Sequence, residues 1–331
     1  GEWVNYLIGR PAGPTKNRNA EGVGIPVDLA FAFHTDAGIT PDDSVIGTLG
    51  IYSTWADKEL FPDGSSRMAS RDLTDLIQTQ IVDDIRTLYN PEWTRRALWD
   101  RQYSEAWRPN VPVMLLELLS HQNLADMRYG LDPRFRFDVS RAIYKGMLRF
   151  LAFREGRAYV VHPLPVSHFS LLQKEKGTLE LSWKPVTDPL EPTAIPTAYK
   201  VYRRCGDKGW DRGIEVSKPS LTLPLAANNS SCDYKITALN DGGESFPGEV
   251  LSAGFVEHPR GTVLIVNAFD RVSGPSFFDT PEKAGVEWWR DRGVPWMAET
   301  GVTGDQYDFD RKKPWTDDDN PGWGSSSNEM E

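Results

Sequence analysis

Residues 27–33 read VDLAFAF, and residues 111–117 read VPVMLLE. Both are almost unbroken runs of apolar side chains, which is typical of strands that are covered on both faces. A third run, SVIGTLGIY at residues 44–52, lies between them and also predicts a strand. These three segments indicate a sheet that is buried between other layers.

Two helices are predicted beside these strands. Apolar residues recur at helical spacing from Leu73 to Leu88 and again from Val139 to Phe150. The second segment follows Asp132-Pro133, a favourable N-cap and first-turn pair. Because strands and helices alternate over residues 1–155, we expect an α/β domain with a largely parallel sheet.

The remainder of the chain has a different pattern. Residues 156–176 carry two prolines and predict a linker, whereas residues 177–256 contain alternating strands such as LELSW, YKVYR and YKITA separated by turn residues. In residues 257–331, TVLIV at 262–266 predicts a buried strand and residues 281–292 predict a helix. A strand, a helix and a polar tail cannot bury a core alone, so we expect the start of a further α/β module, truncated.

Composition excludes several classes of protein. The chain has 331 residues, with 37 Lys and Arg against 47 Asp and Glu, a net charge of −10. This balance argues against nucleic acid as a partner. No apolar run reaches the roughly 18 residues of a membrane-spanning helix, and the N-terminus lacks the features of a signal peptide. Twelve Trp and 24 Pro favour an extracellular or carbohydrate-processing protein.

Two of the predicted strands end in residues that can do chemistry. His34 follows the first strand and Glu117 ends the strand VMLLE. Sites in parallel α/β sheets gather at the carboxyl ends of strands. A zinc site needs about three protein ligands and an open position, and a nearby carboxylate takes the proton of the attacking water. The alternative is a hydrogen-bonded loop histidine and an ordinary capping or salt-bridged carboxylate. The sequence contains no HExxH, CxxC or GxSxG motif and no glycine-rich phosphate loop.

The stretches VDLAFAFHTDAG (27–38) and VPVMLLELLSHQN (111–123) resemble the second half of zinc-dependent N-acetylmuramoyl-L-alanine amidase domains. The resemblance implies that His34 binds Zn²⁺, that Glu117 is catalytic and that Asn123 matches the family's asparagine. The whole chain resembles large secreted proteins of Bacteroidetes, often labelled xanthan lyase, in which an amidase-like domain precedes fibronectin-like modules.

The chain departs from the amidase pattern at its metal site. The family's first two zinc ligands, a histidine and a glutamate, lie upstream of the matching region, and this chain has no histidine before residue 34. Two expected ligands are therefore absent from this chain, and Asp36 or His121 would have to complete the site.

A second resemblance covers residues 177–256. The stretches LSWKP (181–185), YKVYRR (199–204) and YKITALNDGGESFP (234–247) resemble strands of fibronectin type III domains. These domains are β-sandwiches that act as spacers or docking modules. The resemblance places Cys205 and Cys232 at facing ends of neighbouring strands, which implies a disulfide and an oxidising compartment. Two reduced thiols are the alternative.

These observations lead to one functional expectation with two alternatives. We expect a zinc-dependent cell-envelope hydrolase that cleaves an amide in peptidoglycan, secreted, periplasmic or at the cell surface. The first alternative is a non-catalytic glycan- or cell-wall-binding module. The second is a polysaccharide (xanthan) lyase, for which Tyr103 or His121 is available as a base.

The expected partners follow from the same reading. They are peptidoglycan or a polysaccharide, and either the missing N-terminal part or another chain. Residues 93–107 (WTRRALWDRQYSEAW) mix aromatic and basic side chains. They are expected either to line a sugar- or peptide-binding cleft near Glu117 or to pack as an amphipathic connection.

Overall fold

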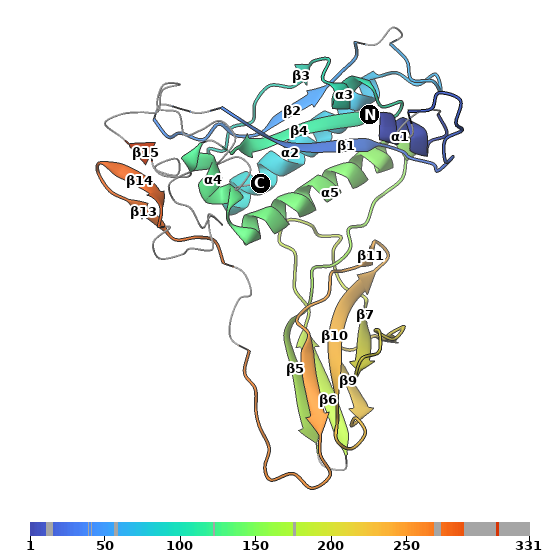
Figure 1. Ribbon diagram of the computed structural model, residues 1–331, viewed down its shortest axis with the longest axis vertical. Helices are drawn as coiled ribbons and strands as arrows, with labels where there is room; N and C mark the ends of the chain where they lie inside the picture. Colours follow the sequence, from blue (N-terminus) through green and yellow to red (C-terminus); the bar gives the residue numbers. More distant parts are fainter. Residues whose placement is uncertain are drawn as a thin grey trace. The chain divides into compact units, whose positions relative to one another are not determined.

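A computed structural model describes residues 1–10, 16–38, 40, 42–55, 59–121, 123–174, 177–267, 273–287 and 309–310 (Figure 1). The chain divides into two compact units. Unit 1 comprises Gly1–Gly156 with Phe269–Glu331, and unit 2 comprises Arg157–Ala268. Within the described part of the chain, no helix is both long enough and apolar enough to cross a membrane.

Unit 1 is built on a four-stranded sheet with the order β1-β4-β2-β3. Its strands are β1 (Ala30–Asp36), β2 (Leu49–Tyr52), β3 (Trp99–Asp100) and β4 (Val113–Ser120). β1 is parallel to β4 and β2 is parallel to β3, but β2 and β4 are antiparallel. The prediction of a largely parallel sheet is therefore wrong, and the sheet is mixed. The chain passes from β1 to β2 through residues 37–48 with no crossover helix among those described, so β2 runs back in the opposite direction.

Helices α2 (Met68–Leu88) and α5 (Pro133–Glu155) pack on one face of this sheet (Figure 1). Their apolar residues share a core with the alternate residues Met114, Leu116 and Leu118 of β4. The helices approach closely at Gly146, where an added Cβ would lie 2.6 Å from the Cα of Ile77. The predicted cap of α5 is confirmed, because the Asp132 carboxylate accepts from the backbone N–H of Arg134 at 2.8 Å.

A buried ion pair also joins the two helices. Lys145 on α5 is 1% exposed, and its Nζ lies 2.6 Å from Oδ2 of Asp84 on α2. The Gln80 side-chain amide donates to the other oxygen of Asp84 at 2.8 Å. Because a buried charge is costly without a partner, this pair favours one register of α2 against α5.

The other face of the sheet is covered by a smaller element. Ala106 of α3 (Ser104–Trp107) packs with Leu115 of β4 and with Leu49 and Ile51 of β2. The two short helices α1 (Glu2–Leu7) and α4 (Leu124–Gly130) lie at the N-terminus and directly after β4. Every residue of β4 is buried except Glu117, which is half-buried, and His34 on the neighbouring β1 is exposed.

Unit 2 is a fibronectin type III-like β-sandwich. One sheet has the order β5-β6-β9, and the other has β11-β10-β7-β8, with β12 also paired to β10. The strands are β5 (Ser167–Lys174), β6 (Thr178–Lys184), β7 (Ala198–Cys205), β8 (Ile214–Val216), β9 (Ser220–Pro224), β10 (Ser230–Asn240), β11 (Gly243–Glu244) and β12 (Leu251–Phe255). Alternate residues such as Leu181, Val201 and Ile236 form the core between the sheets.

Two segments that flank the predicted sandwich differ in structure from their predictions. The expected linker 156–176 contains β5, which pairs with β6 and belongs to the sandwich. The expected strand at 262–266 is not a strand, and Val263 to Val266 are each at least 72% exposed. An apolar run becomes a buried strand only where another strand pairs with it, and the described chain supplies none here.

The last described segments form strands and not the expected helix. β13 (Phe277–Asp279), β14 (Lys283–Val286) and β15 (Phe309–Asp310) make a three-stranded antiparallel sheet. The helix predicted over residues 281–292 is therefore wrong for residues 283–286, and its residues 288–292 lie outside the described part of the chain. The acidic run at 317–319 also lies outside it.

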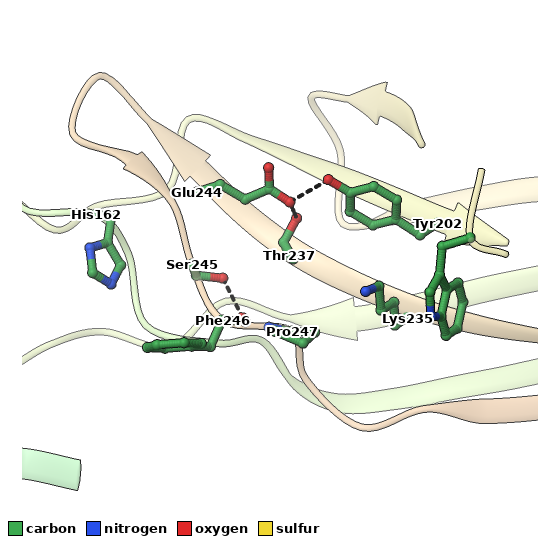
Figure 2. A pocket seen from close by; sticks show the side chains of 9 residues that line it. His162, Tyr202, Lys235, Thr237, Glu244, Ser245, Phe246 and Pro247 are labelled. Atoms are coloured by element: carbon green, nitrogen blue, oxygen red, sulfur yellow. Dashed lines mark hydrogen bonds between the residues drawn. The ribbon is translucent and has the colours of Figure 1, made fainter. Parts of the chain in front are cut away.

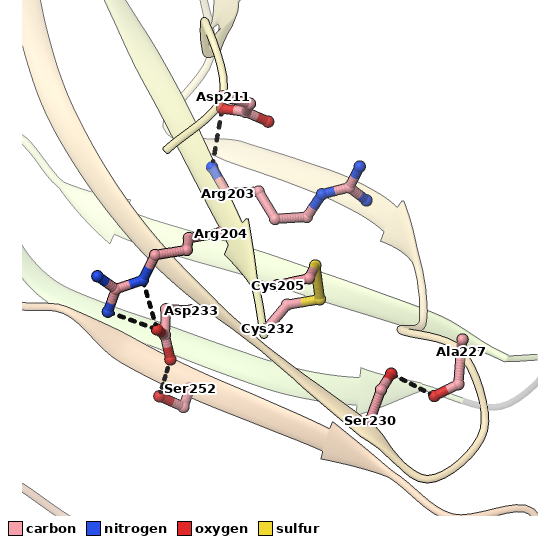
Figure 3. Close-up of a disulfide and its surroundings, with 9 residues drawn as sticks. All are labelled: Arg203, Arg204, Cys205, Asp211, Ala227, Ser230, Cys232, Asp233 and Ser252. Carbon is pink, nitrogen blue, oxygen red and sulfur yellow. Dashed lines mark hydrogen bonds and ion pairs between the residues drawn. A yellow bond between two sulfur atoms is a disulfide. The ribbon is translucent and has the colours of Figure 1, made fainter. Parts of the chain in front are cut away.

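Cys205 and Cys232 form a disulfide, with their Cα atoms 4.1 Å apart (Figure 3). They are register partners on β7 and β10, as the fibronectin resemblance implies. Arg204 and Asp233 are the next register pair on the same strands. The Arg204 guanidinium lies 2.7 Å from the Asp233 carboxylate, which also accepts from the Ser252 hydroxyl. These two contacts hold the pKa of Asp233 below its usual value.

We predict that Cys205→Ser with Cys232→Ser destabilises unit 2 by about 3 kcal/mol, because the crosslink no longer restricts the unfolded chain. Hydrogen exchange of the β7 and β10 amides should become about a hundredfold faster. Ser231→Ala, on the exposed side of β10, is the control and should change exchange little. Equal exchange in the double variant and in the parent would contradict the prediction.

Candidate functional site

His34 and Glu117 occupy directly opposed positions on the two parallel strands β1 and β4. Side chains alternate along a strand, so both lie on the face that carries Ala32 and Leu115, opposite α2 and α5. His34 is exposed and Glu117 is half-buried. The structure therefore brings the two predicted site residues to one face near the carboxyl ends of their strands.

Asp36 lies two residues beyond His34 on the same face and carries an ion pair. Nη1 of Arg96 lies 2.6 Å from its Oδ2. The guanidinium of Arg96 also lies 5.6 Å from the centre of the Trp99 ring, and that of Arg101 lies 5.7 Å from the same ring. We call His34, Asp36, Arg96 and Glu117 the polar strip.

The helix α3 adds a third carboxylate, that of Glu105, to this region. The hydroxyl of Ser104, chiefly, and the nearby His34 to a smaller extent hold the pKa of Glu105 below its usual value. His34 therefore lies within electrostatic range of Glu105 as well as opposite Glu117. The polar strip and Glu105 thus combine hydrogen-bond donors with acceptors on one face of the sheet.

The described residues do not fit a complete zinc site. Zinc needs about three protein ligands, and His34 with Glu117 supplies two at most. Asp36 is held by the positive guanidinium of Arg96, which opposes metal binding there. No group of three or more His, Cys, Asp or Glu that could hold a metal ion occurs in the part of the chain that the structure describes.

His121, the other residue expected to complete the site, has a different environment. It is 9% exposed, and its Nδ1 lies 2.9 Å from the hydroxyl of Thr35. Both residues line a cavity of about 550 Å³ with apolar side chains of α4 and α5, including Met127 and Phe135, and His34 also borders this cavity. Tyr103, the other lyase candidate, precedes α3 on the opposite face, so the fold separates the two candidate bases.

Asn123 has a clear role in positioning the loop that follows β1. Its side-chain amide donates to the carbonyl of Ser44 at 2.8 Å and to the Asp126 carboxylate at 2.6 Å. Its Oδ1 accepts from the backbone N–H of Thr40 at 3.1 Å. The residue that resembles the family's asparagine therefore ties Thr40 and Ser44 to the carboxyl end of β4.

Asp126 is the centre of this arrangement, and the sequence reasoning missed it. It is fully buried and accepts from the backbone N–H groups of Ile46, Gly47 and Ser120. Burial raises the pKa of Asp126, and the hydrogen bonds to the carboxylate reduce that rise without cancelling it. An acidic residue in the first turn after an Asn N-cap is the sequence feature that could have indicated it.

The aromatic segment at 93–107 separates into two parts. Trp93 is fully buried and packs with Tyr129 and Phe135 in the core. Trp99, Tyr103 and Trp107 are 37–47% exposed. The first part is therefore structural, and only the second part is available to a ligand.

We predict that Asp126→Asn destabilises unit 1 by about 2 kcal/mol, because both carboxylate oxygens accept and the new amide NH₂ group would face N–H donors. The loss of unfolding free energy is measured by chemical denaturation, with hydrogen exchange of the β4 amides as the probe. Asp83→Asn, on the exposed side of α2, is the matched control and should stay within about 0.5 kcal/mol of the parent. A fully stable Asp126→Asn protein would show that the network does not hold the loop.

A scan against protein-family models finds no match, and no curated protein matches the sequence. Among solved structures, the twitchin kinase region from C. elegans is 20% identical over 30% of this chain and 18% of its own, with a TM-score of 0.27. Domains d3–d4 of the rat CD45 extracellular region are 11% identical over 30% of this chain and 53% of theirs, with a TM-score of 0.26. A structure titled "Myokine structure" is 13% identical over 29% of this chain and 99% of its own, with a TM-score of 0.25. Likenesses this weak carry no argument about function. The assignment of unit 2 as a fibronectin type III-like sandwich rests on its strand pairing.

Proposed function

We propose that unit 1 is a non-catalytic binding module for peptidoglycan or a related glycan of the cell envelope, and that the polar strip contacts the ligand. The observation that carries this proposal is the row formed by the exposed His34, the half-buried Glu117 and the partly exposed Asp36–Arg96 pair near the carboxyl ends of β1 and β4. The row offers donors and acceptors next to one another, which suits a ligand rich in hydroxyl and amide groups.

The charges of the strip support the same ligand class. Peptidoglycan combines sugar hydroxyls with short peptides that carry carboxylates and amides. The guanidinium of Arg96 is fixed by Asp36 and by the Trp99 ring, so little side-chain entropy is lost when a ligand contacts it. The disulfide supports an oxidising compartment, in agreement with a protein that acts outside the cytoplasm.

A zinc-dependent amide hydrolase is the second candidate, and one observation favours it. His34 and Glu117 are register partners, an arrangement that suits a ligand and a base beside one reacting group. The polar strip alone does not meet the coordination needs of zinc, so this candidate needs further ligands from outside the described residues.

The test is co-sedimentation of the full chain with insoluble peptidoglycan, with insoluble cellulose as the polymer control. We expect His34→Gln combined with Glu117→Gln to weaken binding about tenfold, because two polar contacts are altered. His258→Gln and Glu92→Gln change the same residue types at exposed positions outside the strip and should bind like the parent.

Two outcomes would contradict the binding module. One is unchanged sedimentation of the double variant. The other is release of new amino groups from peptidoglycan by the parent chain, lost in Glu117→Gln alone, which would establish the hydrolase instead.

A further inference from the structure

The solvent face of unit 2 carries a pocket that the sequence did not indicate (Figure 2). Its volume is about 440 Å³, and its walls come from β7, β10, β11 and the segments beside them. The side chains that line it include those of His162, Tyr202, Trp210, Lys235, Glu244 and Phe246. This pocket lies wholly within one compact unit.

The ammonium group of Lys235 is held in place by aromatic rings. Its Nζ lies 4.6 Å from the centre of the Trp210 ring and 5.1 Å from that of Tyr202. Arg204 stacks on the Trp210 ring and Lys200 on the Tyr202 ring, so cations and rings alternate along the sheet face. No carboxylate among the described residues forms an ion pair with Lys235, so its three N–H donors remain available to a ligand.

The carboxylate of Glu244 is also held in place, and it complements this donor. Its Oε1 accepts from the Tyr202 hydroxyl at 2.6 Å and from the Thr237 hydroxyl at 2.7 Å (Figure 2). Burial raises the pKa of Glu244, but these hydrogen bonds and the two nearby lysines outweigh that effect and lower it. Within the described chain Oε2 makes no hydrogen bond, so an ionised acceptor faces the pocket beside the Lys235 donor.

An apolar wall completes the pocket. Phe246 is 67% exposed, and its ring lies 6.5 Å from that of His162 at an interplanar angle of 80°. Figure 2 shows Phe246 and His162 on the opposite side of the pocket from Tyr202. An exposed ring beside a fixed donor and a fixed acceptor suits a ligand that has both an apolar face and adjacent hydroxyl groups.

We propose that this pocket of unit 2 binds a saccharide. One hydroxyl of the sugar donates to Oε2 of Glu244, a neighbouring hydroxyl accepts from Nζ of Lys235, and the C–H face of the ring packs on Phe246. One cation and one carboxylate line the pocket, so their charges balance and a neutral sugar fits better than a strongly charged ligand. This inference does not depend on the function proposed for unit 1.

Saturation-transfer NMR on the full chain tests the proposal, with methyl glycosides of glucose, galactose, mannose and N-acetylglucosamine as probes. We expect at least one glycoside to bind with a Kd on the order of 1 mM, with transfer strongest to its ring C–H protons. Phe246→Ala and Glu244→Gln should each weaken binding about tenfold. Phe153→Ala and Glu215→Gln, exposed residues outside the pocket, should leave it unchanged.

Further variants and controls show which site a bound sugar occupies and whether each variant is folded. Transfer that persists in Phe246→Ala but is lost in Glu117→Gln would place the sugar on the polar strip of unit 1 and would overturn this proposal, so failure of the function proposed for unit 1 is distinguishable from failure here. Thermal unfolding of each variant checks that unit 2 remains folded. Absence of transfer from all four glycosides, equal transfer in the pocket variants and the parent, or preferential binding of glycine as a zwitterionic probe would overturn the proposal.

Discussion

The parallel pairing of β1 with β4 is the constraint on which the candidate site of unit 1 depends. Five consecutive register pairs, from Ala30 with Val113 to His34 with Glu117, fix which residues share a face. A slip of one residue would move His34 to the side that α2 and α5 cover. Beyond His34 the register shifts, so Asp36 lies opposite Ser120, and the buried Asp126 holds both the Ser120 amide and the loop after β1.

The two units present polar groups in different ways. In unit 1 the polar strip lies near the carboxyl ends of strands β1 and β4. The strands are held in position by the core that β4 shares with α2 and α5. In unit 2 the pocket lies on the outer face of a sandwich sheet that a disulfide crosslinks, and rings fix the charged groups. Both arrangements restrict side chains before a ligand arrives, which lowers the entropic cost of binding.

The sequence predicted the elements that have strong periodicity, namely β1, β4, α2 and α5. It placed His34 and Glu117 at the ends of buried strands, whereas β1 continues to Asp36 with no fully buried residue and β4 continues to Ser120. It did not predict the mixed sheet, because strand direction depends on the connections, and it missed β5, because two prolines nearby indicated a linker. Arg96 and Asp126 were missed because their roles come from contacts 60 and 80 residues distant in the chain. The exposed run at 262–266 shows that burial depends on a partner strand and not on composition alone.

We propose that the polar strip of unit 1 binds ligands without a metal, since Arg96 engages the carboxylate that would complete a zinc site. The most direct test is the zinc content of the full chain and of His34→Ala after equilibration with micromolar zinc and buffer exchange, measured by elemental analysis. We expect no stoichiometric zinc in either protein. About one zinc per chain in the parent, lost in His34→Ala, would contradict it.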